Sequence, residues 1–292
     1  MLSVILDDTR DPARNLALDE ALARAAAYRS AVGHGPRTLV RRSPSGRPVA
    51  GRFASARPRP AHSALGGAVA GLPVLRVWQC SPSVLVGRFQ DVARAVDLAA
   101  CARDGVEVVR RATGGGAVCF GPGTLAFTLV QRPGRRVPLE ELVFAAVEGL
   151  GVPRGPLRAG RAVQAARLLT RTACLVHVAV QVGPGGACPT GDAAGDAAGD
   201  AAGRPTLADF GPAMTMDAVR AAVLGAVVDA FGVARTRRPD ALESSVRDHL
   251  HAVRYGDLAW HLTGAPGDGA SMSGSRAAGE GEHSASAART DG

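Results

Sequence analysis

The stretch from Val108 to Phe127 constrains the fold most strongly, because a glycine triplet separates two runs of strand-forming residues. It reads VVRRATGGGAVCFGPGTLAF. Three consecutive residues without Cβ atoms tolerate positive φ and let backbone N–H groups approach an anion closely. Arg110 and Arg111 stand just before the glycines and can add charge-assisted contacts to phosphate or carboxylate. The residue types alone favour equally an anion-binding loop and a glycine-rich hairpin that binds nothing.

Two common nucleotide-binding loops do not fit this stretch. The chain has no G-x-x-x-x-G-K-[ST] motif, and no helix is expected directly after the glycines, which argues against a dinucleotide-binding fingerprint. Because neighbouring residues on a strand point to opposite faces, one arginine of the pair is expected to face the core.

Charge and composition narrow the class of protein. All 34 basic residues are arginines, against 26 acids, and the net charge of +8 favours anionic partners such as nucleotides or acidic carrier domains. The arginines are spread along the chain, so nucleic-acid binding is not expected. No uninterrupted apolar run is long enough for a membrane span, and the N-terminus reaches acidic residues too early for a secretion signal. We therefore expect a cytoplasmic protein with reduced cysteines.

Alternating helical and strand-like patterns predict an α+β fold, with mixed, mainly antiparallel sheets packed against helices. Residues 1–262 are expected to form one domain, with insertions at about 33–71 and 189–205 and a disordered tail at 263–292. Expected strands are 74–80, 83–87, 106–110, 117–120, 124–131 and 172–182, and expected helices are 14–28, 92–103, 139–150, 214–231 and 242–252.

No metal site is predicted. The three aspartates of the GDAA repeat at 191–203 lack the remaining ligands of a calcium loop. His249, His251 and His261 do not share a helix face. His177, alone in an apolar strand, is interpreted as a hydrogen-bonded core residue.

The run RRATGGGAV closely resembles the signature of lipoate-protein ligase A and its biotin-ligase and octanoyltransferase relatives. Other segments resemble the family in the same order along the chain: residues 15–20 (NLALDE), residues 75–91 (LRVWQCSPSVLVGRFQD, similar to a family hairpin), residues 121–125 and, faintly, residues 254–260 (RYGDLAW).

This resemblance implies a biotin/lipoate-ligase-type domain and a two-step reaction. ATP, with Mg²⁺, activates lipoate or octanoate as an acyl-adenylate, and the acyl group then passes to a lysine on a carrier domain of the E2 or glycine-cleavage H-protein type. The residues that the resemblance places at the substrate and nucleotide site are Arg88, Gln90, Arg110, Arg111, Gly114, Gly115, Gly116, Ala117 and Val118.

The chain departs from the family at one catalytic position. The family lysine that contacts the carboxylate and α-phosphate corresponds to Ala162, and the chain contains no lysine at all. Arg161 is the candidate substitute cation, although its planar fork cannot reproduce the point charge of an ammonium.

Three hypotheses follow from this departure. The first is a ligase that keeps acid activation, and the second is an ATP-independent acyltransferase with Cys119 or Cys188 as nucleophile. The third is a non-catalytic relative that binds an acyl group or a carrier domain.

Overall fold

The computed structural model describes residues 1–33, 73–134, 137–159, 162–185, 189 and 206–265. The predicted insertions and tail fall almost wholly outside these ranges, as do the GDAA repeat, Arg161 and Cys188.

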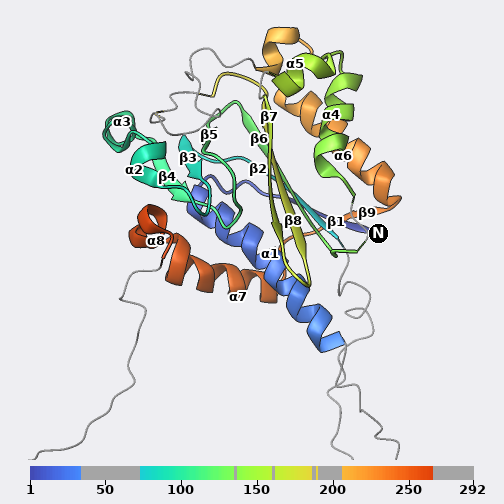
Figure 1. The fold of residues 1–292 in the computed structure, drawn as a ribbon. Coiled ribbons are helices and arrows are strands. Elements are labelled where there is room, and N and C mark those ends of the chain that lie inside the picture. The colour runs from blue at the N-terminus through green and yellow to red at the C-terminus, as the bar shows by residue number, and fades with distance from the viewer. Residues whose placement is uncertain (34–72, 135–136, 160–161, 186–188, 190–205, 266–292) are drawn as a thin grey trace, which may run out of the picture.

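Two mixed sheets form the framework (Figure 1). The larger has the strand order β7-β8-β6-β2-β1-β9 and the smaller has the order β4-β3-β5. Antiparallel pairs predominate, while β1 pairs with β2 and β9, and β3 with β4, in parallel. The strands are β1 (Leu2–Leu6), β2 (Val74–Trp78), β3 (Ser83–Val86), β4 (Glu107–Arg110), β5 (Val118–Phe120), β6 (Thr124–Gln131), β7 (Val163–Leu169), β8 (Cys174–Gln181) and β9 (Ala234–Thr236). The α+β prediction is confirmed.

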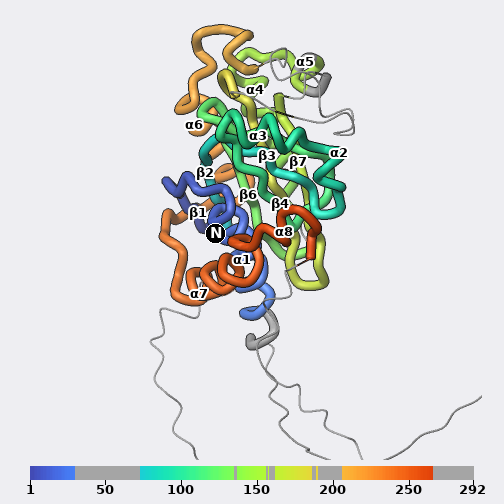
Figure 2. The backbone as a smooth tube through the Cα atoms, turned by 90° about the vertical axis from the view of Figure 1, so that its left-hand side faces the viewer, coloured from blue at the N-terminus to red at the C-terminus, as the bar shows by residue number. Residues whose placement is uncertain are grey.

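Helices cover both faces of the larger sheet (Figure 1). Helices α4 (Leu139–Gly149) and α6 (Met216–Phe231) pack on one face, and α1 (Pro12–Gly33), backed by α7 (Ala241–Leu250), packs on the other. The smaller sheet carries α2 (Val92–Ala95), α3 (Leu98–Asp104) and α8 (Leu258–Thr263) near one end (Figure 2). The remaining elements are α5 (Arg154–Ala159), η3 (Leu207–Phe210) and η4 (His251–Tyr255).

Burial along the strands explains which of them the sequence reveals. All eight residues of β6 are buried, because this strand lies inside the larger sheet with helices on both faces. The edge strand β7 instead alternates between more and less buried positions, and its Ala, Gln and Arg residues give no strong strand signal. The sequence patterns accordingly predict β6 with the correct bounds and miss β7, together with the short β1 and β9.

Two local predictions need correction. The expected hairpin at residues 75–91 does not form, because the turn at Ser81 and Pro82 sends β2 into the larger sheet and β3 into the smaller one. The expected helix at 92–103 is divided into α2 and α3, since Asp97 begins a second helix by accepting a hydrogen bond from the N–H of Ala100.

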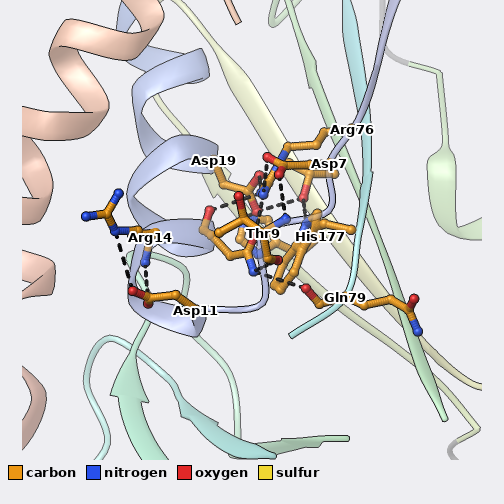
Figure 3. Close-up of polar contacts among 11 residues, drawn as sticks. Asp7, Thr9, Asp11, Arg14, Asp19, Arg76, Gln79 and His177 are labelled. Carbon is orange, nitrogen blue, oxygen red and sulfur yellow. Dashed lines mark hydrogen bonds and ion pairs between the residues drawn. The ribbon is translucent and has the colours of Figure 1, made fainter. Parts of the chain in front are cut away.

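A buried polar network ties α1 to the larger sheet (Figure 3). The guanidinium of Arg76, on β2, is fully buried and pairs with Asp19 at 2.7 Å and with Asp7 at 2.9 Å. It also donates to the backbone and side-chain oxygens of Asn15. Thr128, on β6, donates to the other carboxylate oxygen of Asp19. The family-like segment at 15–20 therefore serves the framework of the fold.

Candidate functional site

The glycine loop, residues 113–116, connects β4 to β5 and lies against the turn at residues 87–90 that follows β3. The N–H of Arg88 donates to the carbonyl of Thr113 at 2.9 Å. The two backbones approach so closely that a Cβ on Gly87 would stand 1.9 Å from the carbonyl oxygen of Gly115. Gly115 itself has φ +98°, a conformation that favours glycine. Glycine is thus required on both sides of this contact.

Arg111 holds the glycine loop from beneath. Its guanidinium donates to the carbonyls of Leu85 at 2.5 Å, Gly114 at 2.9 Å and Gly116 at 2.6 Å. The side chain is almost fully buried, and burial lowers the pKa of Arg111 to about 10, so it stays charged at neutral pH. Arg111 therefore fixes the loop and places a positive charge behind it.

The outer side of the glycine loop is open. Within the described part of the chain, the N–H groups of Gly114, Gly115 and Gly116 donate to no protein acceptor. A Cβ on Gly114 would meet no atom within 4 Å. Adjacent N–H groups without a protein acceptor, with a guanidinium behind them, are suited to bind an anion. Among the described residues, nothing therefore packs against the loop at the side-chain position of Gly114.

An apolar cavity opens beside the loop, between the two sheets. Its enclosed volume is small, about 30 Å³, and the empty space in front of the lining, open solvent included, is about 330 Å³. Small side chains on the larger sheet leave the space, and Arg111 lines it from the smaller sheet. The lining residues are Trp78, Leu85, Arg111, Val118, Phe120, Ala126, Gln164, Ala165, Ala166, His177, Val178 and Ala179. A narrow apolar space with an anion-binding loop nearby suits a molecule with a hydrocarbon body and a charged end.

His177 is part of this cavity wall, although its sequence context predicts a hydrogen-bonded core residue. Its Nε2 lies 3.6 Å from the Oδ2 of Asp19, too far for a hydrogen bond, and has no other partner among the described residues (Figure 3). Burial lowers the pKa of His177 to about 4. The negative charge of Asp19 acts to raise this pKa, and the positive charges of Arg111 and Arg76 act to lower it. His177 is therefore neutral at physiological pH.

The lowered pKa of His177 predicts a loss of stability in mild acid. The unfolded state has the higher pKa, so it binds more protons as the pH falls below 6.5. Between pH 7 and pH 5 this residue should reduce the free energy of unfolding by about 2 kcal/mol. Urea unfolding of wild type and His177→Met at both pH values measures it. An equal loss in the two proteins would show that His177 does not titrate in this way.

Three of the predicted site residues, Arg110, Arg88 and Gln90, make their contacts with other parts of the protein. The side chain of Arg110 donates to six backbone carbonyls, as described below. Arg88 stacks over Trp260, with its guanidinium carbon 4.3 Å from the ring centroid. The side-chain oxygen of Gln90 accepts a hydrogen bond from the N–H of Gly87 at 2.8 Å, which shapes the turn. Ala117, fully buried, and Val118, half-buried, continue from the glycines into β5.

The sequence predicts two ways to compensate for the missing lysine, a substitute cation at Arg161 or a cysteine nucleophile. Ala162, at the family lysine position, is buried in the core beside β7. Arg161 lies outside the described residues, so the structure does not place a substitute cation. Cys119, on β5, is disulfide-bonded and thus carries no free thiol in this structure, while Cys188 is again outside the described ranges. Residue types on β7 and β8 gave no signal for the cavity, since alanines there are equally typical of a packed core.

The described residues hold no cluster of three or more His, Cys, Asp or Glu side chains suited to a metal ion. Among the same residues, no helix combines the length and apolar character needed to cross a bilayer.

Known proteins resemble parts of the chain, and the family model covers the glycine loop. Residues 65–155 match the family model described as the lipoyl protein ligase A/B catalytic domain. The mitochondrial lipoyl amidotransferase of Mus musculus is 38% identical over 58 residues, which cover 20% of this chain and 16% of the relative. Lipoate-protein ligase A subunit 1 of Thermoplasma acidophilum is 41% identical over 59 residues, covering 20% of this chain and 22% of the relative. The matches thus span less than a quarter of either relative.

Solved structures extend the likeness to most of the fold. A lipoate-protein ligase A bound with ATP has a TM-score of 0.63 at 19% identity, covering 89% of this chain and 98% of the other. A Thermoplasma acidophilum structure with bound lipoic acid has a TM-score of 0.62 at 20% identity, with the same coverage. The chain therefore shares the fold of these lipoate-protein ligase structures. The resemblance to lipoate-protein ligases that the motifs predict is confirmed over residues 65–155 and in the fold.

Proposed function

We propose that the chain binds lipoate or octanoate in the cavity between the sheets and transfers it, as an acyl-adenylate, to a lysine of a carrier domain. The observation that carries this proposal is the pairing of an apolar cavity with three N–H groups, at Gly114–Gly116, that have no acceptor among the described residues. The cavity suits a medium-length hydrocarbon chain, and the loop suits the charged carboxyl and phosphate groups. Relatives named lipoate-protein ligase support the choice of acid.

The residues of this chain fit the phosphate groups of ATP in part. In the first step a carboxylate oxygen attacks the α-phosphorus and pyrophosphate leaves; in the second, a lysine amine attacks the acyl carbon and AMP leaves. Both transition states carry negative charge on oxygens. Fixed N–H groups of the glycine loop, with Arg111 behind them, would stabilise that charge without rearranging.

The missing lysine sets an expected limit on the rate. Arg111 cannot replace that lysine directly, because its guanidinium is held by the carbonyls of the loop and of Leu85. A donor removed from a developing negative charge costs about 3 kcal/mol, or roughly a hundredfold in rate. We propose Arg161 as the substitute cation, and we expect slow adenylation compared with relatives that have the lysine.

The carrier reaction tests this function. Purified protein is incubated with octanoate or lipoate, ATP and Mg²⁺, and an unmodified lipoyl domain, and the carrier is weighed by mass spectrometry. We expect the carrier to gain one acyl group only when ATP is present, and Arg161→Ala to slow the gain at least tenfold. Absence of any acylated carrier after prolonged incubation with wild type would refute the ligase proposal.

One observation favours a second candidate, an ATP-independent acyltransferase. The mouse relative is a lipoyl amidotransferase, and a lysine that contacts phosphate would not be needed for direct transfer. This candidate predicts acyl transfer from an already acylated carrier without ATP. A cysteine route would also give a thioester on Cys188, or on Cys119 once its disulfide is reduced, that Cys188→Ser or Cys119→Ser abolishes. Binding of an acyl-adenylate analogue with neither reaction would indicate the non-catalytic relative.

A further inference from the structure

Arg110 connects three segments that are distant in the sequence. Its Nε donates to the carbonyls of Trp260 and His261 at 3.2 and 3.1 Å, and one terminal nitrogen donates to that of Leu262 at 3.0 Å. The other terminal nitrogen donates to the carbonyls of residues 87, 88 and 90 at 3.0, 3.1 and 2.8 Å. The side chain is 1% exposed. Arg110 thus joins β4, the 87–90 turn and the end of helix α8.

The backbone of Arg110 strengthens the connection to α8. Its N–H donates to the Nδ1 of His261 at 3.0 Å, and its carbonyl accepts from the indole N–H of Trp260 at 3.1 Å. His261 can accept at Nδ1 because its Nε2 lies 2.8 Å from the carbonyl of Tyr255, which fixes the proton on Nε2. Trp260 is held in turn between the guanidinium groups of Arg88 and Arg254. Helix α8 is therefore docked firmly on β4 (Figure 2).

The 87–90 turn passes this restraint to the glycine loop. Gly87 is in backbone contact with Gly115, and the N–H of Arg88 donates to Thr113. A change in the turn therefore shifts the carbonyls and N–H groups of the loop. Arg111, the second arginine, acts on the same loop from the cavity side.

We propose that Arg110 is a positioning residue, through which helix α8 holds the glycine loop in the shape that binds the acyl-adenylate. This rests on the proposed function for the identity of the ligand, and it assigns the two adjacent arginines different tasks. Arg110 affects ligand binding only through its hydrogen bonds to the 87–90 turn, whereas Arg111 donates hydrogen bonds to the glycine loop itself. A lysine at position 110 would have too few donors, in the wrong geometry, to serve six carbonyls.

The test compares Arg110→Lys with Arg237→Lys, a control far from the loop. Arg237 follows β9, at the outer edge of the larger sheet, and pairs with the buried Glu243, so its loss also destabilises the fold. The probe is octanoyl-sulfamoyl-adenosine, titrated by calorimetry at equal fractions of folded protein. We expect Arg110→Lys to weaken binding at least thirtyfold and Arg237→Lys less than twofold. Equal weakening in the two variants, or none in Arg110→Lys, would overturn the proposal.

Hydrogen exchange supplies a readout that does not depend on the ligand. In the wild type the N–H of Arg88 is bonded to Thr113, and it should exchange much faster in Arg110→Lys but not in Arg237→Lys. Unchanged exchange at Arg88 in Arg110→Lys would contradict the coupling between α8 and the glycine loop, whether or not the wild type binds the probe. A wild type that binds no probe would count against the proposed function alone. If Arg110→Lys does not fold, His261→Gln, which weakens the contacts of the imidazole with the Arg110 backbone and with the carbonyl of Tyr255, takes its place under the same criteria.

Discussion

Gly87→Ala is expected to destabilise the protein by about 3 kcal/mol and to abolish binding of an acyl-adenylate analogue. The added Cβ would stand 1.9 Å from the carbonyl oxygen of Gly115 and 3.0 Å from its carbonyl carbon. Both atoms are backbone, so no side chain can rotate away, and the turn and the glycine loop must separate. Separation would also break the hydrogen bond from Arg88 to Thr113. Chemical denaturation measures the first effect and calorimetric titration the second.

Gly105→Ala is the matched control for this substitution. Gly105 has φ +64°, and a Cβ there would meet no atom within 4 Å, so the change introduces backbone strain of about 1 kcal/mol without a collision. It lies at the end of α3, away from the loop. A Gly87→Ala protein no less stable than Gly105→Ala would mean that the two backbones do not pack as described.

Arg76→Leu should lower the free energy of unfolding by about 4 kcal/mol. The substitution leaves Asp19, which is fully buried, without its cation, and it removes the hydrogen bonds to Asn15 and Asp7. An uncompensated carboxylate in the interior is strongly destabilising, and here it also faces the neutral His177. Urea denaturation at pH 7 provides the measurement.

The comparison for Arg76 is Arg220→Leu. Arg220 forms an ion pair of the same length, 2.7 Å, with Asp217, but the aspartate is largely solvent-exposed. Surface pairs of this kind contribute less than about 1 kcal/mol. If both substitutions cost the same, the burial of the Arg76 network does not determine its contribution.

The sequence patterns predicted those parts of the fold in which local composition and burial agree. Strand β6 and helix α6 are uniformly or periodically apolar, and their predicted bounds are close to those observed. The sequence patterns miss strand β7 because its Ala and Gln side chains have little strand propensity. These side chains line a cavity, where small residues leave room for a ligand. No local pattern could show that Ser81 and Pro82 divide a hairpin between two sheets, since that depends on contacts made by distant strands.

One part of the candidate site could be predicted from local sequence, and the rest could not, because it depends on distant contacts. Three glycines after two arginines indicate a close approach of backbone to an anion, and the structure has an open loop at that place. The different roles of Arg110 and Arg111 could not be predicted from the sequence, because they depend on carbonyls at residues 260–262, about 150 positions away. The sequence predicts His177 to be a hydrogen-bonded core residue, because it cannot show that the nearby Asp19 is already bonded to Arg76 and Thr128.

Gly114→Ala offers the most direct test of the central claim, that the N–H groups of the loop face the charged part of an acyl ligand. A Cβ on Gly114 would meet no atom within 4 Å and the residue has no positive φ, so the added methyl group should leave the free energy of unfolding nearly unchanged. Calorimetric titration with octanoyl-sulfamoyl-adenosine should show at least tenfold weaker binding than wild type, because the methyl group occupies the space that the ligand needs. Undiminished affinity in a fully folded Gly114→Ala protein would contradict the claim.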